Sequence, residues 1–321
     1  MVGKIIGTGS YIPEQVWENE KLSQMVDTND EWIRERTGIA RRHIAGNREP
    51  TVYMAAEAAK AALDNAGIRA EEVDLILVAT ISPGEIMPCT ACGVQERIGA
   101  SRATCFDLSS ACTGFLFALN TAQAYLGMGI YRTALVIGAE RLSNLTNWKD
   151  RGTCILFGDG AGAAVLQASP EGFYVQVTHS TGEKGSVLTC TSRNQEKYED
   201  IPAAAETYMQ MDGKEVFKFA VSREPEVIRE LLEQSGKKQE EIRYYLLHQA
   251  NERIVKSVAK RLGESMEKFP MNISQYGNTS SASIPILMDE QNRKGAFSSG
   301  DFLVLSGFGG GLSYGASLLR W

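Results

Sequence analysis

Cys112 lies in a run of small residues that follows the short apolar stretch 104–108. The residues after it predict a helix that carries Phe117 and Leu126 and ends near Gly127. A thiol at the start of a helix faces unpaired N–H groups and the positive end of the helix dipole, which favour the thiolate. We therefore expect the pKa of Cys112 to fall below the roughly 8.5 of a free cysteine. The alternative is a buried core cysteine, which is the commoner situation.

Two further residues could act with this cysteine. His248 ends the apolar stretch 244–247, and the ends of strands in α/β sheets are where sites gather. Asn278 lies in another run of small residues that bends into a helix, where its side chain either caps the helix or donates an amide N–H into a cleft. The glycines of 308–311 either permit a tight turn or present a backbone N–H to an oxyanion.

The six cysteines form no dense framework, which favours free thiols in a reducing cytoplasm. Cys89 and Cys92 have a zinc or redox spacing, but no second pair of cysteines or histidines accompanies them, so we expect no metal site. Gly7 and Gly9 do not form a dinucleotide-binding motif, because Ile12 stands where the third glycine is required.

The composition is that of a globular protein, with 43% hydrophobic and 22% charged residues. The 321 residues suit two packed domains or a duplicated one. A net charge of −6 and the lack of a Lys/Arg-rich tract argue against nucleic-acid binding. We expect no signal peptide and no membrane span, and hence a cytoplasmic protein.

Predicted helices alternate with apolar strands along the chain. Strands are expected at 2–8, 74–80, 174–178 and 244–247, and helices at 19–37, 54–66 and 252–262. Gly67 is a suitable C-terminal cap for the second of these helices. This alternation indicates layered α/β architecture.

The same landmarks occur twice, which predicts an internal duplication. Gly67 matches Gly236, 169 positions later. The later matches drift in offset: Cys112-Thr113 with Asn278-Thr279, 135–137 with 303–305, and Gly162 with Gly315. A period this long is a whole domain. We therefore expect two pseudo-symmetric halves, 1–170 carrying Cys112 and 171–321 carrying His248 and Asn278, with equivalent positions converging at their interface.

Together these motifs resemble β-ketoacyl-acyl carrier protein synthase III. The resemblance runs nearly end to end and rests on the Cys112 turn and on segments 27–33, 36–39, 150–160, 248–254, 276–283 and 307–311. It implies a duplicated thiolase fold, a homodimer and the initiating condensing enzyme of type II fatty acid synthesis, which has no tightly bound cofactor and uses an acyl-coenzyme A thioester as substrate.

The resemblance also implies residue roles. Cys112 is the acyl-accepting nucleophile with His248 and Asn278 as partners, and the N–H groups of Cys112 and Gly310 hold the oxyanion. The residues expected at coenzyme A are Thr28, Trp32, Arg36, Thr37, Arg151, Gly213 and Asn251, with Trp32 and Arg151 flanking the adenine. Those expected at acyl carrier protein include Lys218, Gln249, Ala250, Asn251 and Arg253.

Two residues depart from the family pattern. Met87 stands where acetyl-specific members often place an aromatic residue that limits the primer pocket from the partner subunit, so we expect a pocket for larger primers. Lys214 replaces an asparagine that is usual beside the pantetheine arm, which leaves that contact open.

The predicted helix 252–262 has two faces. Ile254, Val258 and Leu262 recur at four-residue spacing and should face the core. Arg253, Lys256 and Lys260 lie away from that stripe. They either solvate a surface helix or attract a strongly acidic acyl carrier protein.

Two half-reactions follow from these assignments. The Cys112 thiolate attacks acyl-coenzyme A and retains the acyl group; malonyl-acyl carrier protein then loses carbon dioxide, and its enolate, stabilised by His248 and Asn278, attacks the Cys112 thioester to give a 3-ketoacyl product. The alternatives are a secondary-metabolism acyltransferase of the same fold, a Cys-His hydrolase and a non-catalytic dimer partner.

Overall fold

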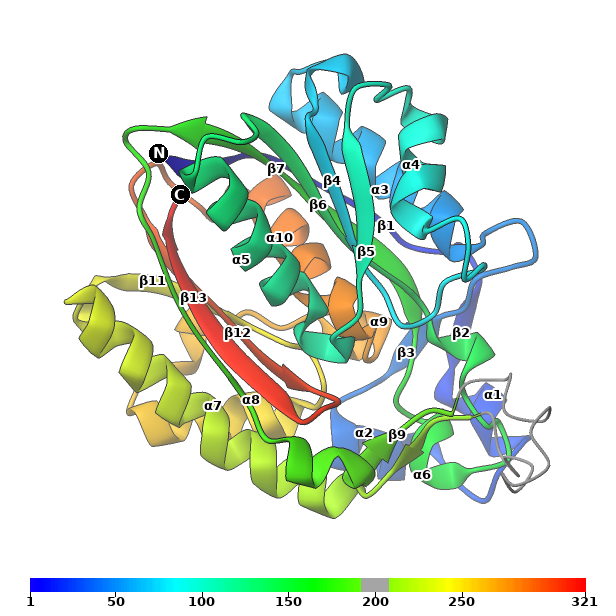
Figure 1. The fold of residues 1–321 in the computed structure, drawn as a ribbon. Helices are drawn as coiled ribbons and strands as arrows, with labels where there is room; N and C mark the ends of the chain where they lie inside the picture. The colour runs from blue at the N-terminus through cyan, green and yellow to red at the C-terminus, as the bar shows by residue number, and fades with distance from the viewer. Residues whose placement is uncertain (192–207) are drawn as a thin grey trace.

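The computed structural model describes residues 1–191 and 208–321, and its two larger β-sheets face each other across two central helices (Figure 1). The N-terminal sheet has the strand order β1-β7-β6-β4-β5. Its strands are β1 (Val2–Tyr11), β4 (Leu75–Ala79), β5 (Thr104–Leu108), β6 (Thr133–Arg141) and β7 (Asp159–Ser169). The C-terminal sheet has the order β11-β12-β13-β8, formed by β8 (Tyr174–Ser180), β11 (Ile242–Leu247), β12 (Phe302–Gly309) and β13 (Ser313–Arg320).

Helices cover both faces of each sheet. Helices α5 (Gly114–Gly127) and α10 (Ser283–Arg293) lie between the sheets. The outer face of the N-terminal sheet carries α3 (Thr51–Ala66) and α4 (Thr90–Ile98), and that of the C-terminal sheet carries α7 (Gly213–Ser235) and α8 (Glu252–Leu262). The prediction of a layered α/β fold is confirmed.

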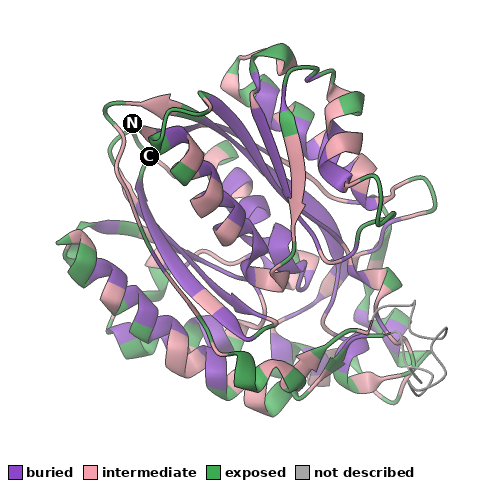
Figure 2. Cartoon of the chain, in the orientation of Figure 1, coloured by how far each residue is buried: buried purple, intermediate pink, exposed green. Residues whose placement is uncertain are grey.

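Successive side chains of the central strands enter different cores, because they point to opposite faces of the sheet. Leu75 and Leu77 of β4 join the core between the sheets, whereas Ile76 and Val78 join the core under α3 and α4. Both sheets are therefore buried on both faces, as Figure 2 shows. This double burial explains why the sequence of β4 is continuously apolar.

The two sheets repeat one pattern of strand pairing. Leu77 of β4 lies beside Val136 of β6 in a parallel pair, and Leu246 of β11 lies beside Leu305 of β12 in another. Both partners are displaced by the same 169 residues that separate Gly67 from Gly236. The predicted match of 135–137 with 303–305 is therefore one residue out of register.

The predicted match of Cys112 with Asn278 is also wrong. Two 3₁₀ turns, Ala111–Thr113 and Ser280–Ala282, lead into α5 and α10. Each begins with a left-handed residue, Ala111 at φ 45° and Ser280 at φ 49°. Cys112 is thus the counterpart of Ser281, three residues beyond Asn278. Both turns lie in runs of small residues. Such runs have no pattern of side-chain size or polarity from which the alignment of the two segments could be fixed.

β7 belongs to the N-terminal sheet and β8 to the C-terminal sheet. We propose that the two halves, 1–170 and 171–321, meet in the connection between these strands. No helix in residues 1–191 and 208–321 is long and apolar enough to cross a membrane.

Segment 19–37 forms two short helices, whereas a single helix was predicted. α1 (Asn19–Ser23) ends before Gln24, and α2 (Asp30–Thr37) begins after Asn29, whose side chain accepts a hydrogen bond from the Trp32 N–H at 2.8 Å. An N-cap asparagine has non-helical backbone angles, so a helix that begins after it cannot be continuous with the helix before it. The other short elements are β2 (Val16–Glu18), β3 (Arg41–His43), α6 (Arg151–Cys154), β9 (Leu188–Thr189), β10 (Gln210–Met211) and α9 (Ile273–Tyr276).

Glu224 is an unusual component of the C-terminal core. It lies buried on α7 and forms no ion pair in the described residues, and the Ser306 hydroxyl offsets only part of the effect of its burial. Burial raises its pKa from 4.5 to about 8. Between these two values the unfolded chain has lost a proton that the folded chain keeps, so folding stability falls as the pH rises.

We predict that Glu224→Gln increases the free energy of unfolding by about 1–3 kcal/mol near pH 8, because it removes a buried acid that has no cationic partner. The increase should be smaller near pH 5, where the carboxyl is protonated in the folded chain. Urea unfolding followed by circular dichroism measures both values. Glu233→Gln, at an exposed position of the same helix, is the control and should change stability by less than about 0.5 kcal/mol. A less stable Glu224→Gln chain near pH 8 would contradict this account.

Candidate active site

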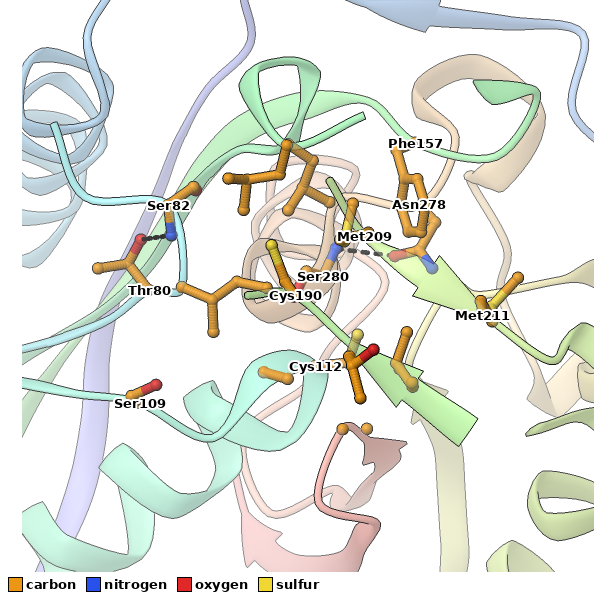
Figure 3. Close-up of a pocket in the computed structure, with 18 of the residues that line it drawn as sticks. Thr80, Ser82, Ser109, Cys112, Phe157, Cys190, Met209, Met211, Asn278 and Ser280 are labelled. Carbon is orange, nitrogen blue, oxygen red and sulfur yellow. Dashed lines mark hydrogen bonds between the residues drawn. The ribbon is translucent and has the colours of Figure 1, made fainter. Parts of the chain in front are cut away.

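A cavity of about 940 Å³ lies where the two halves meet, and residues from both line it. Cys112 comes from the first half, and His248, Asn278 and Gly310 from the second. Figure 3 shows Cys112, Asn278 and Ser280 around this space. The structure therefore brings together all the residues for which the sequence predicts a catalytic or oxyanion role.

Hydrogen bonds hold the turn that carries Cys112. The Thr113 hydroxyl donates to the Ser110 carbonyl at 2.7 Å and bonds the Ser313 hydroxyl at 2.7 Å. Gly309 packs directly on the turn, since a Cβ there would lie 2.8 Å from the Cys112 nitrogen. A side chain at this glycine would therefore displace the nucleophile and the N–H beside it.

The pKa predicted for Cys112 is wrong in direction. Burial raises the pKa of the thiol to about 12, and the charge of Glu140 raises it further. The Ser280 hydroxyl and the backbone N–H of Cys112 lower it, but by less. The helix dipole is weakened here because a 3₁₀ turn precedes α5 and the Gly114 N–H already bonds the Ala111 carbonyl. The cysteine therefore rests as a thiol.

His248 is buried against Phe308, and burial lowers its pKa from 6.5 to about 3, so its imidazole is neutral. Its Nδ1 lies 2.6 Å from the Ser283 hydroxyl, which also accepts the Gln249 N–H at 3.4 Å. When the Ser283 hydroxyl donates to Nδ1, the proton of the neutral imidazole lies on Nε2. That nitrogen has no hydrogen-bond partner and is available as a donor.

The amide of Asn278 is oriented by the backbone. Its oxygen accepts the Ser280 N–H at 2.8 Å, which fixes the orientation that the sequence left open (Figure 3). The NH₂ group is then the part of the side chain that can donate to a group in the cavity. The Asn278 side chain thus accepts a hydrogen bond from the first residue of the turn and, through its NH₂ group, offers a donor to the cavity.

The residues expected at coenzyme A fall into two groups. Gly213 and Asn251 line the cavity, and the Asn251 amide also joins the end of α2 to the start of α8 by donating to the Arg36 carbonyl at 3.0 Å. Farther out, the Trp32 ring lies 4.0 Å from the Arg151 guanidinium and 5.2 Å from that of Arg36. Trp32 and Arg151 already contact each other, so a ring can enter between them only if they separate.

Thr28 and Thr37 differ in what they can offer a ligand. The Thr28 hydroxyl is buried and lacks a partner. The Thr37 hydroxyl donates to the Ile33 carbonyl at 2.6 Å and accepts the Ile39 N–H at 3.0 Å. Because Thr37 is buried and satisfied within α2, a direct contact of its side chain with coenzyme A is ruled out.

The apolar face predicted for α8 is confirmed, because Ile254, Val258 and Leu262 are all buried. Arg253, Lys256 and Lys260 are exposed, as expected. Gln249 is a correction, since its side chain is buried and bonds the Leu247 carbonyl and the Asn272 N–H. It cannot contact a docked carrier protein directly, whereas Ala250 and Asn251 reach the cavity wall.

Two of the remaining lysines are paired within the chain. Lys218 bonds Glu215 at 2.6 Å, and Lys256 forms an ion pair with Glu252. Lys214, which replaces the asparagine usual in the family beside the pantetheine arm, is exposed in the first turn of α7. Met87 is 87% exposed and lies outside the cavity wall of this chain, although its neighbours Glu85, Ile86 and Cys89 belong to that wall.

Three residues at this site escaped the sequence analysis: Glu140, Ser280 and Ser283. Glu140 ends in a buried carboxylate beside the Cys112 turn, Ser280 begins the turn that mirrors it, and Ser283 orients His248. A constant offset of 169 would have drawn attention to Ser280 as the counterpart of Ala111. No sequence pattern pointed to Glu140.

Two segments match family models. Residues 106–183 match 3-oxoacyl-[acyl-carrier-protein] synthase III, and residues 232–321 match the C-terminal model of the same enzyme. The chain is 48% identical over 320 residues to the β-ketoacyl-[acyl-carrier-protein] synthase III of Clostridium acetobutylicum and 49% identical to that of Clostridium novyi. Each comparison covers 99% of this chain and 98% of the relative.

Solved structures agree with these matches. The 3-oxoacyl-[acyl-carrier-protein] synthase III from Aquifex aeolicus VF5 has a TM-score of 0.93 at 43% identity, covering 99% of this chain and 100% of that one. The priming β-ketosynthase of the R1128 polyketide pathway has a TM-score of 0.94 at 35% identity, covering 99% of this chain and 96% of that one.

We predict that Ser283→Ala reduces condensation about tenfold, because His248 loses the hydroxyl that keeps its proton on Nε2. Cys112 acylation should stay near normal. Nitrogen NMR of the imidazole reports the tautomer directly, and should show loss of the Nε2–H form. Ser317→Ala removes a buried hydroxyl of the C-terminal sheet that bonds Asn120, and is the matched control. Equal loss in both half-reactions would mean that Ser283 only supports the fold.

Proposed function

The chain belongs to the β-ketoacyl-[acyl-carrier-protein] synthase III family, and on that premise we propose how its residues carry out an acyl transfer and then a condensation. Membership makes the chain a condensing acyltransferase. We assign it acyl-coenzyme A and malonyl-acyl carrier protein as substrates and a 3-ketoacyl-acyl carrier protein as product. The observation that carries this assignment is the convergence of Cys112, His248 and Asn278 on one cavity.

In the first half-reaction, Cys112 accepts the acyl group and coenzyme A leaves. The N–H groups of Cys112 and Gly310 stabilise the oxyanion, since both residues line the cavity and donors of this kind act where negative charge develops. Trp32 and Arg151 hold the adenine after separating from their stack, and Thr28 offers its free hydroxyl nearby.

In the second half-reaction, malonyl-acyl carrier protein loses carbon dioxide and leaves an enolate. His248 Nε2 and the Asn278 amide donate to its oxygen. The low pKa of His248 suits this role, because a neutral imidazole donates a hydrogen bond without transferring its proton. The enolate carbon then attacks the Cys112 thioester and forms the new carbon–carbon bond.

The carrier protein docks at the mouth formed by α7 and α8. Arg253 supports this assignment, because its guanidinium lies 5.4 Å from the ring of Phe217, which lines the cavity. It forms no ion pair in the described part of the chain. Lys218, Lys256 and Lys260 add positive charge around it, although Lys218 and Lys256 are partly neutralised by their glutamate partners.

The enzyme works as a homodimer in the cytoplasm. Ile86 and Met87 support the dimer, because two large apolar side chains more than four-fifths exposed favour an interface. In that arrangement Met87 enters the partner subunit's primer pocket. The described cysteines are all free thiols, which is consistent with a reducing compartment.

A priming role in polyketide synthesis is the second candidate. It is favoured by the similarity to the R1128 priming β-ketosynthase. A Cys-His hydrolase is disfavoured, because Asn278 does not orient the imidazole: Nδ1 of His248 is bonded by Ser283, and the Asn278 amide oxygen accepts the Ser280 N–H.

The test is to incubate the protein with labelled acyl-coenzyme A and then with malonyl-acyl carrier protein. We expect an acyl adduct on Cys112 by mass spectrometry, carbon dioxide release and a ketoacyl product. His248→Ala and Asn278→Ala should each reduce condensation about a hundredfold or more while the adduct still forms. Release of free acid without condensation would indicate a hydrolase, and an adduct on another cysteine would refute the assignment of Cys112. Primers of graded length separate fatty acid from polyketide priming.

We predict that Arg253→Glu with Lys256→Glu slows condensation about tenfold at low salt, because docking of an acidic partner loses its complementary charge. Acylation by acyl-coenzyme A should stay near normal, and wild-type condensation should weaken as salt rises. Lys60→Glu with Lys294→Glu, on α3 and just after α10, makes an equal charge change and is the control. No loss from the double variant would remove α8 from the docking site.

A further inference from the structure

A buried arginine joins the two short helices that carry the residues assigned to the adenine of coenzyme A. Trp32 lies on α2 and Arg151 on α6, and these helices lie side by side (Figure 1). Ile33 of α2 and Cys154 of α6 belong to one small apolar core. Arg42, on β3, is completely buried in the same region. A buried charge is costly unless hydrogen bonds satisfy it, so the contacts of this guanidinium are informative.

The guanidinium of Arg42 reaches two separate segments. Its Nη2 donates to the Ile155 carbonyl at 2.8 Å, and Ile155 is the C-cap of α6. Its Nη1 donates to Asn19 Oδ1 at 2.7 Å and to the Trp17 carbonyl at 3.4 Å. Burial lowers the pKa of Arg42 to about 10, so the group is charged near neutrality. All three acceptors are neutral oxygens, so these contacts fix the position of the charge without cancelling it.

Asn19 carries the connection on to α2. It is also completely buried, and its NH₂ group donates to Asp30 Oδ1 at 2.8 Å and to the Ile39 carbonyl at 2.9 Å. Asp30 is the first residue of α2, and Ile39 follows Gly38, the C-cap of that helix. One amide therefore holds both ends of α2, while its oxygen accepts from Arg42. Every hydrogen-bonding group of this side chain is used, which leaves it a single orientation.

We propose that Arg42 and Asn19 are positioning residues that fix the spacing of α2 and α6. That spacing sets the gap between Trp32 and Arg151 into which the adenine of coenzyme A inserts. The proposal rests on the coenzyme A assignment made above. Trp32 and Arg151 are partly exposed, so their side chains can separate from their present contact at 4.0 Å. The helices beneath them cannot follow, because the buried bridge holds both, and the gap that opens is therefore limited to the thickness of a flat ring.

A purely structural role for Arg42 predicts a different result. If the arginine only supports the fold, its loss affects all acyl donors alike. If it spaces the two helices, its loss weakens only those donors that carry an adenine. Pantetheine thioesters have the same reacting group as coenzyme A thioesters but lack the nucleotide. A comparison of the two donors therefore isolates the contribution of the adenine contact.

The measurement is kcat/KM for acylation of Cys112 by an acyl-coenzyme A and by the matching acyl-pantetheine. Wild type should prefer the coenzyme A thioester by about a hundredfold, because binding energy from the remote nucleotide is used at the reacting centre. Arg42→Met should reduce this preference about tenfold, through the coenzyme A value alone. Adenosine 3′,5′-bisphosphate, the nucleotide part of coenzyme A, should also bind the variant about tenfold more weakly by calorimetry.

Three further variants separate geometry from charge and stability. Arg42→Lys keeps the charge, but one ammonium does not span both acceptors, so it should lose the preference as well. Asn19→Leu removes the arm to α2, leaves the bond to Ile155 in place and replaces Arg42→Met if that variant fails to fold. Arg141→Met is the matched control and should keep the preference. Arg141 also has a buried Nε without a partner, and it donates to the carbonyl of Ala45, which lies on neither helix.

Circular dichroism establishes that each variant is folded before it is assayed. An equal loss with both thioesters in Arg42→Met and Asn19→Leu would mean that the bridge only supports the fold, and would overturn the proposal. A wild-type preference that survives in both variants would overturn the positioning role alone and leave the coenzyme A assignment intact. A wild-type protein that shows no preference and does not bind the nucleotide would overturn both.

Discussion

The contact between Gly138 and the turn Ser280–Ala282 joins the two halves of the molecule. A Cβ at Gly138 would lie 2.2 Å from the Ser281 carbonyl oxygen, so only glycine allows the backbones to meet. The Ser281 hydroxyl also donates to the Ala79 carbonyl at 2.9 Å. Through this contact, β6 and β4 of the first half set the position of Asn278 and Ser280 from the second. The turn Ser280–Ala282 is thereby fixed against two strands from a distant part of the chain, next to the cavity.

The low polarity of that junction acts in opposite directions on the two main catalytic groups. Withdrawal from water disfavours the charged form of each, so it raises the pKa of Cys112 and lowers that of His248. Both groups are therefore neutral at rest. A neutral imidazole suits a site in which charge develops on the substrate, whereas a neutral thiol needs help to react. One physical cause thus suits the imidazole to the condensation and opposes formation of the thiolate that the acylation uses.

The sequence predicted most of the scaffold, because that scaffold follows local rules. The double burial of β4, the cap at Gly67 and the apolar stripe of α8 can all be read from residue type and spacing. The acidity of Cys112 could not, since it depends on side chains brought near by folding. The same limit applies to Thr37 and Gln249, whose resemblance-based contacts fail because the fold buries both side chains. The alignment of the two turns could not be predicted from the sequence either, because runs of small residues have no pattern of size or polarity that fixes which positions correspond.

The paired left-handed residues, Ala111 and Ser280, show that one turn geometry is used twice in the chain. Two turns of the same geometry could each carry a nucleophile. Here one turn carries the cysteine and its mate carries serines, while both retain the same strained backbone and the same central helix behind it. The strained backbone is thus common to both turns, whereas the thiol is found on one of them. The site is therefore asymmetric in its chemistry although the two turns are alike: the first carries the nucleophile, and the segment before the second supplies the Asn278 donor.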